Sequence, residues 1–412
     1  MTPGPDLSRA LVVAVVLAGC SVGAPTEGPS PRTATAPATP SSEEQTPLNT
    51  QLIDSAWKND VVTAARLIQA GADVNYKDST AQSAYLIATS EGYLGLLDLT
   101  LRNGANVHDK DSFNGTGLIR AADRGHAAIA GRLVQAGVEI DHVNRLGWTA
   151  LHEAIILGDG SERYVDTVRV LVAAGVDVTI RSQGDGISPL QHAESRRYDE
   201  IARVLRSAIG DERPRDVDAA LLSAAAGGDA DRVALALRAG AKIEARDSRR
   251  RTGLLLAATF DSLAAARVLA YLGASPDALD DQHDTPWLVT GVTGSVEMAE
   301  LLLTADPDLG ILNRFGGTSI IPASERGHVD YVRRVARTRI DTDHVNDLGW
   351  TAMLEAVILG NGGPAHEEIV RILLDAGADP NIADRNRITP LQHARSRGYT
   401  RIATILERAG AR

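Results

Sequence analysis

Histidines and carboxylates are the residues of this chain that could carry acid–base or metal chemistry. The sequence contains ten histidines, and its acidic residues outnumber its basic ones. No His-x-x-x-His pair is present, nor are the paired cysteines typical of a zinc site. Glu153 and Glu355 occupy matching places after Trp148 and Trp350, and single carboxylates of this kind are expected to be solvated at the surface. The pattern therefore predicts neither a metal centre nor an acid–base pair.

Nucleophilic catalysis has no better support in the sequence. Cys20 is the single cysteine, so no cysteine nucleophile is available in the rest of the chain. No glycine-rich loop of the phosphate-binding kind precedes a lysine. We therefore expect no catalytic activity, no metal and no other cofactor.

The apolar run that follows Arg9 indicates an export signal. Residues 11–19 read LVVAVVLAG and are too few for a mature transmembrane helix, which needs about 20 apolar residues. The stretch 17–20, Leu-Ala-Gly-Cys, resembles a bacterial lipobox. That resemblance implies a lipoprotein signal peptide over 1–19, cleavage before Cys20, and a lipid group on its thiol. The alternative is an ordinary secretory signal with a chance cysteine near its end.

The segment after Cys20 has the composition of a linker. Residues 21–47 are rich in Pro, Thr, Ser and Ala and have almost no large apolar side chain. Such a segment buries too little apolar surface to offset its chain entropy. Residues 20–47 are therefore predicted to be a disordered tether, which would span about 30 Å and hold a folded part clear of a membrane.

A period of 33 residues organises the chain from Leu48 to its end, and it must position any functional side chain. One turn position, usually glycine, recurs with this period in two series separated by a shorter step. It marks eleven units, at Asn59, Gly92, Gly125, Gly158, Arg197, Gly228, Asp261, Gly294, Gly327, Gly360 and Gly398.

Each unit predicts two short helices joined by that turn. The first helix opens with Thr389-Pro390-Leu391 or an equivalent, where the missing N–H of proline costs nothing. The second ends with Ala70-Gly71-Ala72-Asp73 or an equivalent, where glycine supplies a left-handed C-cap. These residues resemble the ankyrin-repeat pattern over about 48–412. The resemblance implies an all-α solenoid of about eleven helix–turn–helix repeats with β-hairpin fingers, stacked into one curved array.

Two stretches of the chain are nearly identical. Residues 143–160 read VNRLGWTALHEAIILGDG and residues 345–362 read VNDLGWTAMLEAVILGNG, with the same insertion at 159–164 and 361–366. We interpret them as parts of a duplicated block, with five repeats over 48–209 and six over 217–412. The seam at 210–216 is either a hinge or a shortened finger. Matched insertions often mark a binding face.

Aromatic side chains on the fingers are candidate partner-binding residues. Phe113 and Phe315 occupy equivalent finger positions, and Trp148 and Trp350 follow in the next unit, so each Phe–Trp pair is expected on adjacent fingers. Aromatic side chains dominate binding hot spots. The alternative is that the rings only cover finger backbone. Weaker candidates are Trp57, Phe260, Arg249, Arg250 and Arg251.

These features together predict a membrane-anchored, protein-binding scaffold. The formal net charge of −11 argues against nucleic acid as the main partner. We expect an exported lipoprotein on the periplasmic or extracytoplasmic face of a cell membrane, with a protein partner and no small-molecule substrate. The alternative is an accessory or immunity-type factor that protects or inhibits one envelope enzyme.

Overall fold

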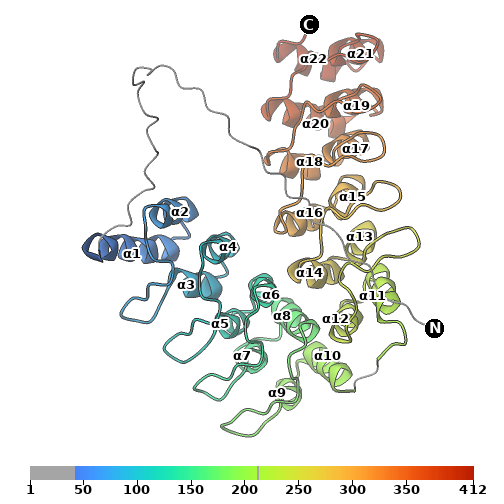
Figure 1. The fold of residues 1–412 in the computed structure, drawn as a ribbon. Helices are drawn as coiled ribbons and strands as arrows, with labels where there is room; N and C mark the ends of the chain where they lie inside the picture. The colour runs from blue at the N-terminus through green and yellow to red at the C-terminus, as the bar shows by residue number, and fades with distance from the viewer. Residues whose placement is uncertain (1–41, 211–212) are drawn as a thin grey trace, which may run out of the picture. The chain divides into compact units, whose positions relative to one another are not determined.

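The computed structural model describes residues 42–210 and 213–412, which form 22 α-helices and no strand (Figure 1). The predicted signal peptide, Cys20 and most of the predicted tether lie outside these residues. The odd-numbered helices are α1 (Ser42–Trp57), α3 (Ala84–Glu91), α5 (Gly117–Asp123), α7 (Ala150–Ile156), α9 (Pro189–Ser195), α11 (Val217–Ala226), α13 (Gly253–Thr259), α15 (Pro286–Thr293), α17 (Ile320–Arg326), α19 (Ala352–Ile358) and α21 (Pro390–Ser396). The even-numbered helices are α2 (Val61–Gln69), α4 (Leu94–Arg102), α6 (Ala127–Gln135), α8 (Glu162–Ala173), α10 (Asp199–Gly210), α12 (Ala230–Arg238), α14 (Leu263–Tyr271), α16 (Val296–Leu303), α18 (Val329–Val335), α20 (Pro364–Asp375) and α22 (Thr400–Arg408).

Helix α1 begins earlier than the repeat period indicated. It starts at Ser42, takes in residues 42–47 of the predicted tether, and contains Pro47 near its N-terminal end. Leu52 and Ile53 of α1 are buried against the first array. The side chain of Asn49 accepts a hydrogen bond from the Asp73 N–H at 2.7 Å. Within the added turns, Gln45 Nε2 donates to the Gly71 carbonyl at 3.3 Å, which ties this part of α1 to the end of α2.

The helix ends follow the predicted pattern. Thr149 caps α7, and Thr149 and His152 exchange both hydrogen bonds of a capping box. Thr389 caps α21 with Pro390 in the first turn. Gly71 has φ +102° after α2, as a left-handed C-terminal residue requires. Because caps depend on neighbouring residues, the sequence predicted them correctly.

The loops between each even helix and the next odd helix, here called fingers, are held differently from the predicted β-hairpins. In the finger 103–116, Asp111 Oδ1 accepts hydrogen bonds from the N–H groups of Phe113 and Gly115, each at 2.8 Å. These N–H groups bond to a side chain instead of an opposing strand. Across the described fingers, antiparallel bridges form between two pairs alone, Lys110–Thr116 and Arg246–Thr252. The prediction of β-hairpin fingers is therefore not confirmed.

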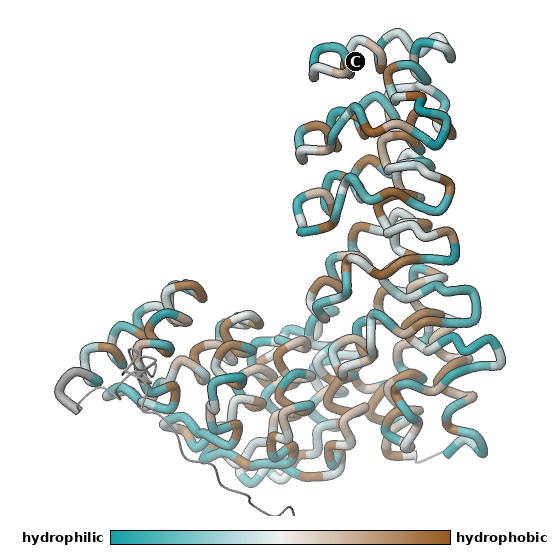
Figure 2. Tube along the Cα trace, turned by 45° about the horizontal axis from the view of Figure 1, so that its top comes forward, coloured by the Kyte–Doolittle hydropathy of each residue, from teal (hydrophilic) through white to brown (hydrophobic). Residues whose placement is uncertain are grey.

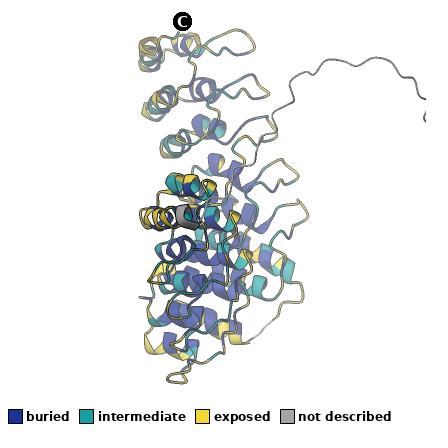
Figure 3. Ribbon diagram, turned by 60° about the vertical axis from the view of Figure 1, so that its left-hand side comes forward, coloured by how far each residue is buried: buried dark blue, intermediate teal, exposed yellow. Residues whose placement is uncertain are grey.

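Apolar residues of the helices form the interior. Within each array, successive odd helices pack side by side, and so do successive even helices. The hydrophobic segments in Figure 2 lie mainly in the helices, whereas the fingers are mainly hydrophilic. Figure 3 shows buried residues along the helix stack and exposed ones along its loops. The buried side chains form two clusters, one drawn entirely from 52–208 and one from 221–406 together with Ala173.

The expectation of one continuous stack is wrong at the seam. Helices α9 and α11 do not share the extensive contact that other successive odd helices make. Instead α12 packs against α8, and α14 packs against α6 and α8, so even helices of the two arrays lie back to back (Figure 1). A Cβ on Gly131 of α6 would lie 2.3 Å from the carbonyl oxygen of Tyr271. This glycine therefore permits the close approach of α6 and α14.

A partly buried ion-pair network joins the same helices. Arg267 of α14 contacts Glu162 at 2.7 Å and Asp166 at 3.0 Å, both on α8. Arg169 of α8 contacts Asp231 of α12 at 2.8 Å and Asp166 at 3.1 Å. Burial raises the pKa of Asp166, although the two guanidinium groups oppose that shift. The network makes the contact between the arrays specific in position, because an unpaired buried charge would be costly.

Candidate functional site

The finger that precedes α7 is organised by Asn144. Its Oδ1 accepts hydrogen bonds from the N–H groups of Leu146 at 2.9 Å and Trp148 at 3.1 Å, and its N–H bonds to the Trp148 carbonyl at 3.0 Å. Gly147 adopts φ +79° at the tip of this turn. The amide of Asn144 donates to Glu153 Oε1 on α7 at 2.6 Å. The finger is thus fastened to a helix by a buried Asn–Glu pair.

The duplicated stretch repeats this arrangement in the second array. Asn346 Oδ1 accepts hydrogen bonds from Leu348 and Trp350 N–H groups, each at 3.0 Å. The Asn346 amide donates to Glu355 Oε1 of α19 at 2.8 Å. The Asn–Glu spacing kept in both stretches therefore has a structural role in holding the finger.

Glu153 and Glu355 correct the expectation of solvated surface carboxylates. Their residues are only 4% and 5% exposed. Burial is the main cause that raises the pKa of each to about 7. Asp123 and Asp111 add to the shift at Glu153, and Glu325 adds to it at Glu355, whereas the Asn amides oppose it. The sequence signal was available, because a glutamate retained with its asparagine in both copies suggests a pair.

Adjacent fingers are joined through their backbones. The Arg145 N–H donates to the Phe113 carbonyl at 2.9 Å, and the Asp347 N–H donates to the Phe315 carbonyl at 2.9 Å. His142 Nε2 lies 2.7 Å from the Asn114 carbonyl oxygen, which adds a second link in the first array. Each Phe–Trp pair therefore lies on neighbouring fingers held in a fixed register.

The two finger pairs present matching apolar side chains. Phe113 is 60% exposed and Phe315 is 51% exposed, while Leu146 and Leu348 are both 48% exposed. Trp148 and Trp350 are half-buried. We call Phe113, Leu146 and Trp148 patch one, and Phe315, Leu348 and Trp350 patch two. The two leucines were not singled out from the sequence, although they lie in the duplicated stretches.

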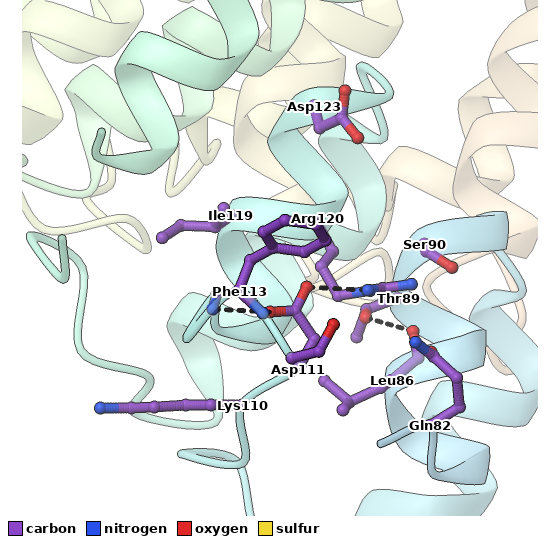
Figure 4. A network of polar contacts seen from close by, with 12 residues as sticks. Gln82, Leu86, Thr89, Ser90, Lys110, Asp111, Phe113, Ile119, Arg120 and Asp123 are labelled. Carbon is purple, nitrogen blue, oxygen red and sulfur yellow. Dashed lines mark hydrogen bonds and ion pairs between the residues drawn. The ribbon is translucent and has the colours of Figure 1, made fainter. Parts of the chain in front are cut away.

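The base of patch one is a polar network (Figure 4). The Asp111 carboxylate lies between the loop that carries Phe113 and the Arg120 side chain, and contacts Arg120 Nη1 at 2.8 Å. Figure 4 also shows Asp123 on the same helix as Arg120. Because Asp111 accepts both backbone N–H groups and a guanidinium N–H, the Phe113 loop has little freedom to rearrange.

The remaining candidate residues lie apart from these patches. Trp57 on α1 and Phe260 at the end of α13 are both exposed. Arg249 and Arg250 are exposed on the finger before α13. Arg251 is instead paired with Asp247 at 2.7 Å, so the predicted basic fingertip presents two guanidinium groups rather than three.

Each inserted loop is tied to the preceding repeat by one buried side chain, Tyr164 or His366, whereas Asp159, Ser161 and Arg163 of the first insertion are exposed. Each insertion lengthens the following helix, and α8 and α20 have 12 residues where α6 has 9. The Tyr164 hydroxyl donates to the Asp123 carbonyl at 3.0 Å. His366 Nε2 lies 2.9 Å from the Glu325 carbonyl oxygen in the equivalent place. These side chains satisfy the exposed end of the preceding repeat's first helix.

Several of the histidines have structural positions. His126 and His328 occupy the N-cap positions of α6 and α18 without a side-chain capping bond, and Nε2 of each lies within hydrogen-bond distance of a backbone carbonyl of the preceding repeat. Burial lowers the pKa of His152 to about 4, so this residue is neutral at ordinary pH. Over residues 42–210 and 213–412, no group of His, Asp and Glu side chains is arranged to hold a metal ion. None of the helices in that part of the chain has both the length and the apolar composition to cross a bilayer.

Comparison with known proteins agrees with the repeated helix pairs of the fold. A family model described as ankyrin repeats (3 copies) matches residues 85–182, 118–218 and 287–384. The ankyrin repeat protein YahD of Escherichia coli K12 is 36% identical over 198 residues, which are 48% of this chain and 98% of YahD. Ankyrin repeat and SOCS box protein 16 of Homo sapiens is 31% identical over 43% of this chain and 40% of its own length.

A crystal structure of an ankyrin repeat domain from Acinetobacter baumannii AYE is also similar. It is 45% identical to this chain, covers 47% of it and 98% of its own length, and superposes with a TM-score of 0.46. Ankyrin repeats are in general scaffolds for protein interaction. The chain belongs to the ankyrin repeat family.

Proposed function

We propose that this protein is a non-catalytic protein-binding scaffold of the bacterial cell envelope. The observation that carries the proposal is the pair of matched patches, because each exposes a Phe side chain and, on the next finger, a Leu side chain whose backbone is held by a buried Asn–Glu pair. Rigid presentation of this kind loses little conformational entropy when a partner docks. The eleven-repeat array then serves as the frame that holds the patches.

The membrane part of the proposal comes from the sequence. The lipobox-like residues 17–20 support lipidation of Cys20, and the composition of the following segment supports a tether that extends from an extracytoplasmic membrane face. Metabolic labelling with a radioactive fatty acid tests this, with Cys20→Ala as the control. Labelling of both proteins, or of neither, would remove the anchor from the proposal.

The binding role is tested by crosslinking and pull-down from envelope membranes. We expect Trp148→Ala with Trp350→Ala to reduce recovery of the partner, while the helical circular-dichroism signal stays near that of the wild type. Equal recovery by both proteins would exclude these residues from the site. Recovery of one tightly bound enzyme would favour the accessory or immunity-type role.

A further inference from the structure

The two patches carry the same apolar side chains but opposite charges at one matching place. Residues 143–148 read VNRLGW and residues 345–350 read VNDLGW, so the single difference is Arg145 against Asp347. In each array the backbone N–H of this residue donates to the phenylalanine carbonyl of the preceding finger at 2.9 Å. The residue therefore adjoins the patch in both arrays, with a guanidinium group at patch one and a carboxylate at patch two.

Patch one has two cations without a carboxylate partner. Arg145 is exposed, and its Nη1 donates to the carbonyl of Ser112, the residue before Phe113, at 2.7 Å. Lys110 is half-buried on the loop that carries Phe113 (Figure 4). In the part of the chain that the structure describes, neither side chain forms an ion pair. Both charges are therefore available to an incoming anion.

The acidic groups around patch one are engaged within the protein. Asp111 is paired with Arg120, and Asp109 is paired with Lys77. On the following finger, Asp185 accepts a hydrogen bond from a backbone N–H of its own loop at 3.1 Å. The two cations of patch one thus keep its exposed charge positive, although the whole chain has a formal net charge of −11.

Patch two has a carboxylate next to its aromatic ring. Asp347 is exposed, and a Cβ added to Gly316 would lie 2.7 Å from its Oδ1. Because Gly316 directly follows Phe315, this carboxylate adjoins the ring on its own finger. An acidic segment that approached the Phe315 ring would meet a charge of the same sign.

The cations near patch two do not replace those of patch one. Arg314 lies over the Phe315 ring at 4.7 Å, but it is already paired with Asp284 at 3.4 Å. Leu312 stands at the place that Lys110 holds in the first array. Arg385, which donates to the Asp347 carbonyl, belongs to the following finger. The contrast between the patches therefore concerns the charges on the two fingers that carry each patch.

We propose that patch one, and not patch two, binds a partner segment in which large apolar side chains lie next to Asp or Glu. The Phe113 and Leu146 side chains contact the apolar part of this segment, and the two cations attract its carboxylates. At patch two the same segment would face Asp347, and such like-charge contacts exclude wrong partners. The inference rests on the proposed protein-binding function and adds to it the chemistry of the partner and a single site per chain.

The probe is a random 12-residue peptide library displayed on phage and selected on the full mature protein. Counter-selection uses Phe113→Ala with Leu146→Ala, whose side chains belong to residues 60% and 48% exposed. Truncation of such exposed side chains should leave the melting temperature nearly unchanged. We expect the enriched peptides to carry large apolar residues next to Asp or Glu. Enrichment of basic or uncharged peptides, or no enrichment over the variant, would overturn the proposal.

One enriched peptide is then synthesised and titrated into the protein by calorimetry. We expect one peptide per wild-type chain, and an affinity lower by about tenfold in Arg145→Asp, which gives patch one the charge of patch two. Arg196→Asp is the matched control, because it makes the same charge change at an exposed position at the C-terminal end of α9. Two peptides per wild-type chain, or equal affinities of these two variants, would contradict the proposal.

The converse change tests whether charge separates the two patches. Leu312→Lys with Asp347→Arg gives patch two the cations of patch one. The backbone bond to the Phe315 carbonyl should persist, because Arg145 makes the same bond in the first array. We expect this variant to bind two peptides per chain. If it still binds one, charge does not decide between the patches and the proposal fails.

The proposed function and this inference fail in different ways. If Trp148→Ala with Trp350→Ala reduces recovery of the envelope partner but Arg145→Asp recovers it as the wild type does, the protein-binding site stands and the charge inference is wrong. If both variants recover the partner as the wild type does, both proposals fail. Arg145-dependent binding to phosphatidylglycerol vesicles, with no peptide enriched, would overturn the inference in favour of an anionic lipid.

Discussion

Glu153 and Glu355 are expected to make the stability of the repeats that contain them depend on pH. The perturbation is Glu153→Gln with Glu355→Gln, which removes both ionisable groups at nearly constant shape. Each glutamine oxygen still accepts the hydrogen bond from its asparagine. The variant cannot form the two carboxylate charges that burial and the neighbouring acidic groups disfavour in the wild type.

The magnitude follows from the pKa values. Each glutamate has a folded pKa of about 7 against an ordinary value of 4.5. The folded protein therefore binds more protons than the unfolded chain, and stability falls as pH rises from 4.5 through 7. At about 1.4 kcal/mol per pKa unit, the full loss above pH 7 is up to about 3 kcal/mol per site. We expect the double variant to be more stable than the wild type at pH 8.5 and to lose that advantage at pH 4.5.

The assay is urea unfolding of the mature protein from pH 4.5 to 8.5, followed by circular dichroism. Hydrogen exchange over residues 143–157 and 345–359 adds a local measure, because a repeat array can open locally. Glu297→Gln is the control, since Glu297 is exposed on α16. If the wild type and the double variant show the same pH dependence, the reasoning about buried carboxylates is refuted.

Three further predictions follow from particular contacts. Asn144→Ala should lower the free energy of unfolding by about 2 kcal/mol, because it leaves Glu153 and two N–H groups without their partner. It should also speed hydrogen exchange at the finger tip, and unchanged exchange would contradict this. Gly131→Ala should destabilise by about 1–3 kcal/mol and raise the radius of gyration in X-ray scattering, because its Cβ meets the Tyr271 carbonyl at 2.3 Å. Gly95→Ala is the matched control, because a Cβ at Gly95 would meet only Val61, at 3.9 Å. Equal stability and equal radius of gyration of the two variants would exclude the close crossing of α6 and α14. Tyr164→Phe should lower stability by about 1 kcal/mol through the lost bond to the Asp123 carbonyl, measured as a lower melting temperature; no change would mean that the inserted loop is held by packing alone.

The helix pairs and their caps could be predicted from the sequence because they depend on residues close in the chain. Thr149, Pro390 and Gly71 act on their own turns, so the period and the turn residues suffice. The positions of Phe113 and Phe315 on the fingers follow from the same period. The fingers themselves were predicted less well, because Asp111 takes up the N–H groups that a hairpin strand would have paired.

Long-range packing decided the rest. Whether Glu153 and Glu355 are solvated depends on what the neighbouring repeat and finger place over them. The return of α12 and α14 onto α6 and α8 joins residues more than 100 positions apart, as in the Arg267–Glu162 pair, and no local pattern encodes such a distance. The sequence by itself determined the repeats and the duplicated surface, since these are written in each unit. Only the tertiary structure decided where the stack turns back and which charges it buries, because both depend on the surfaces that meet there.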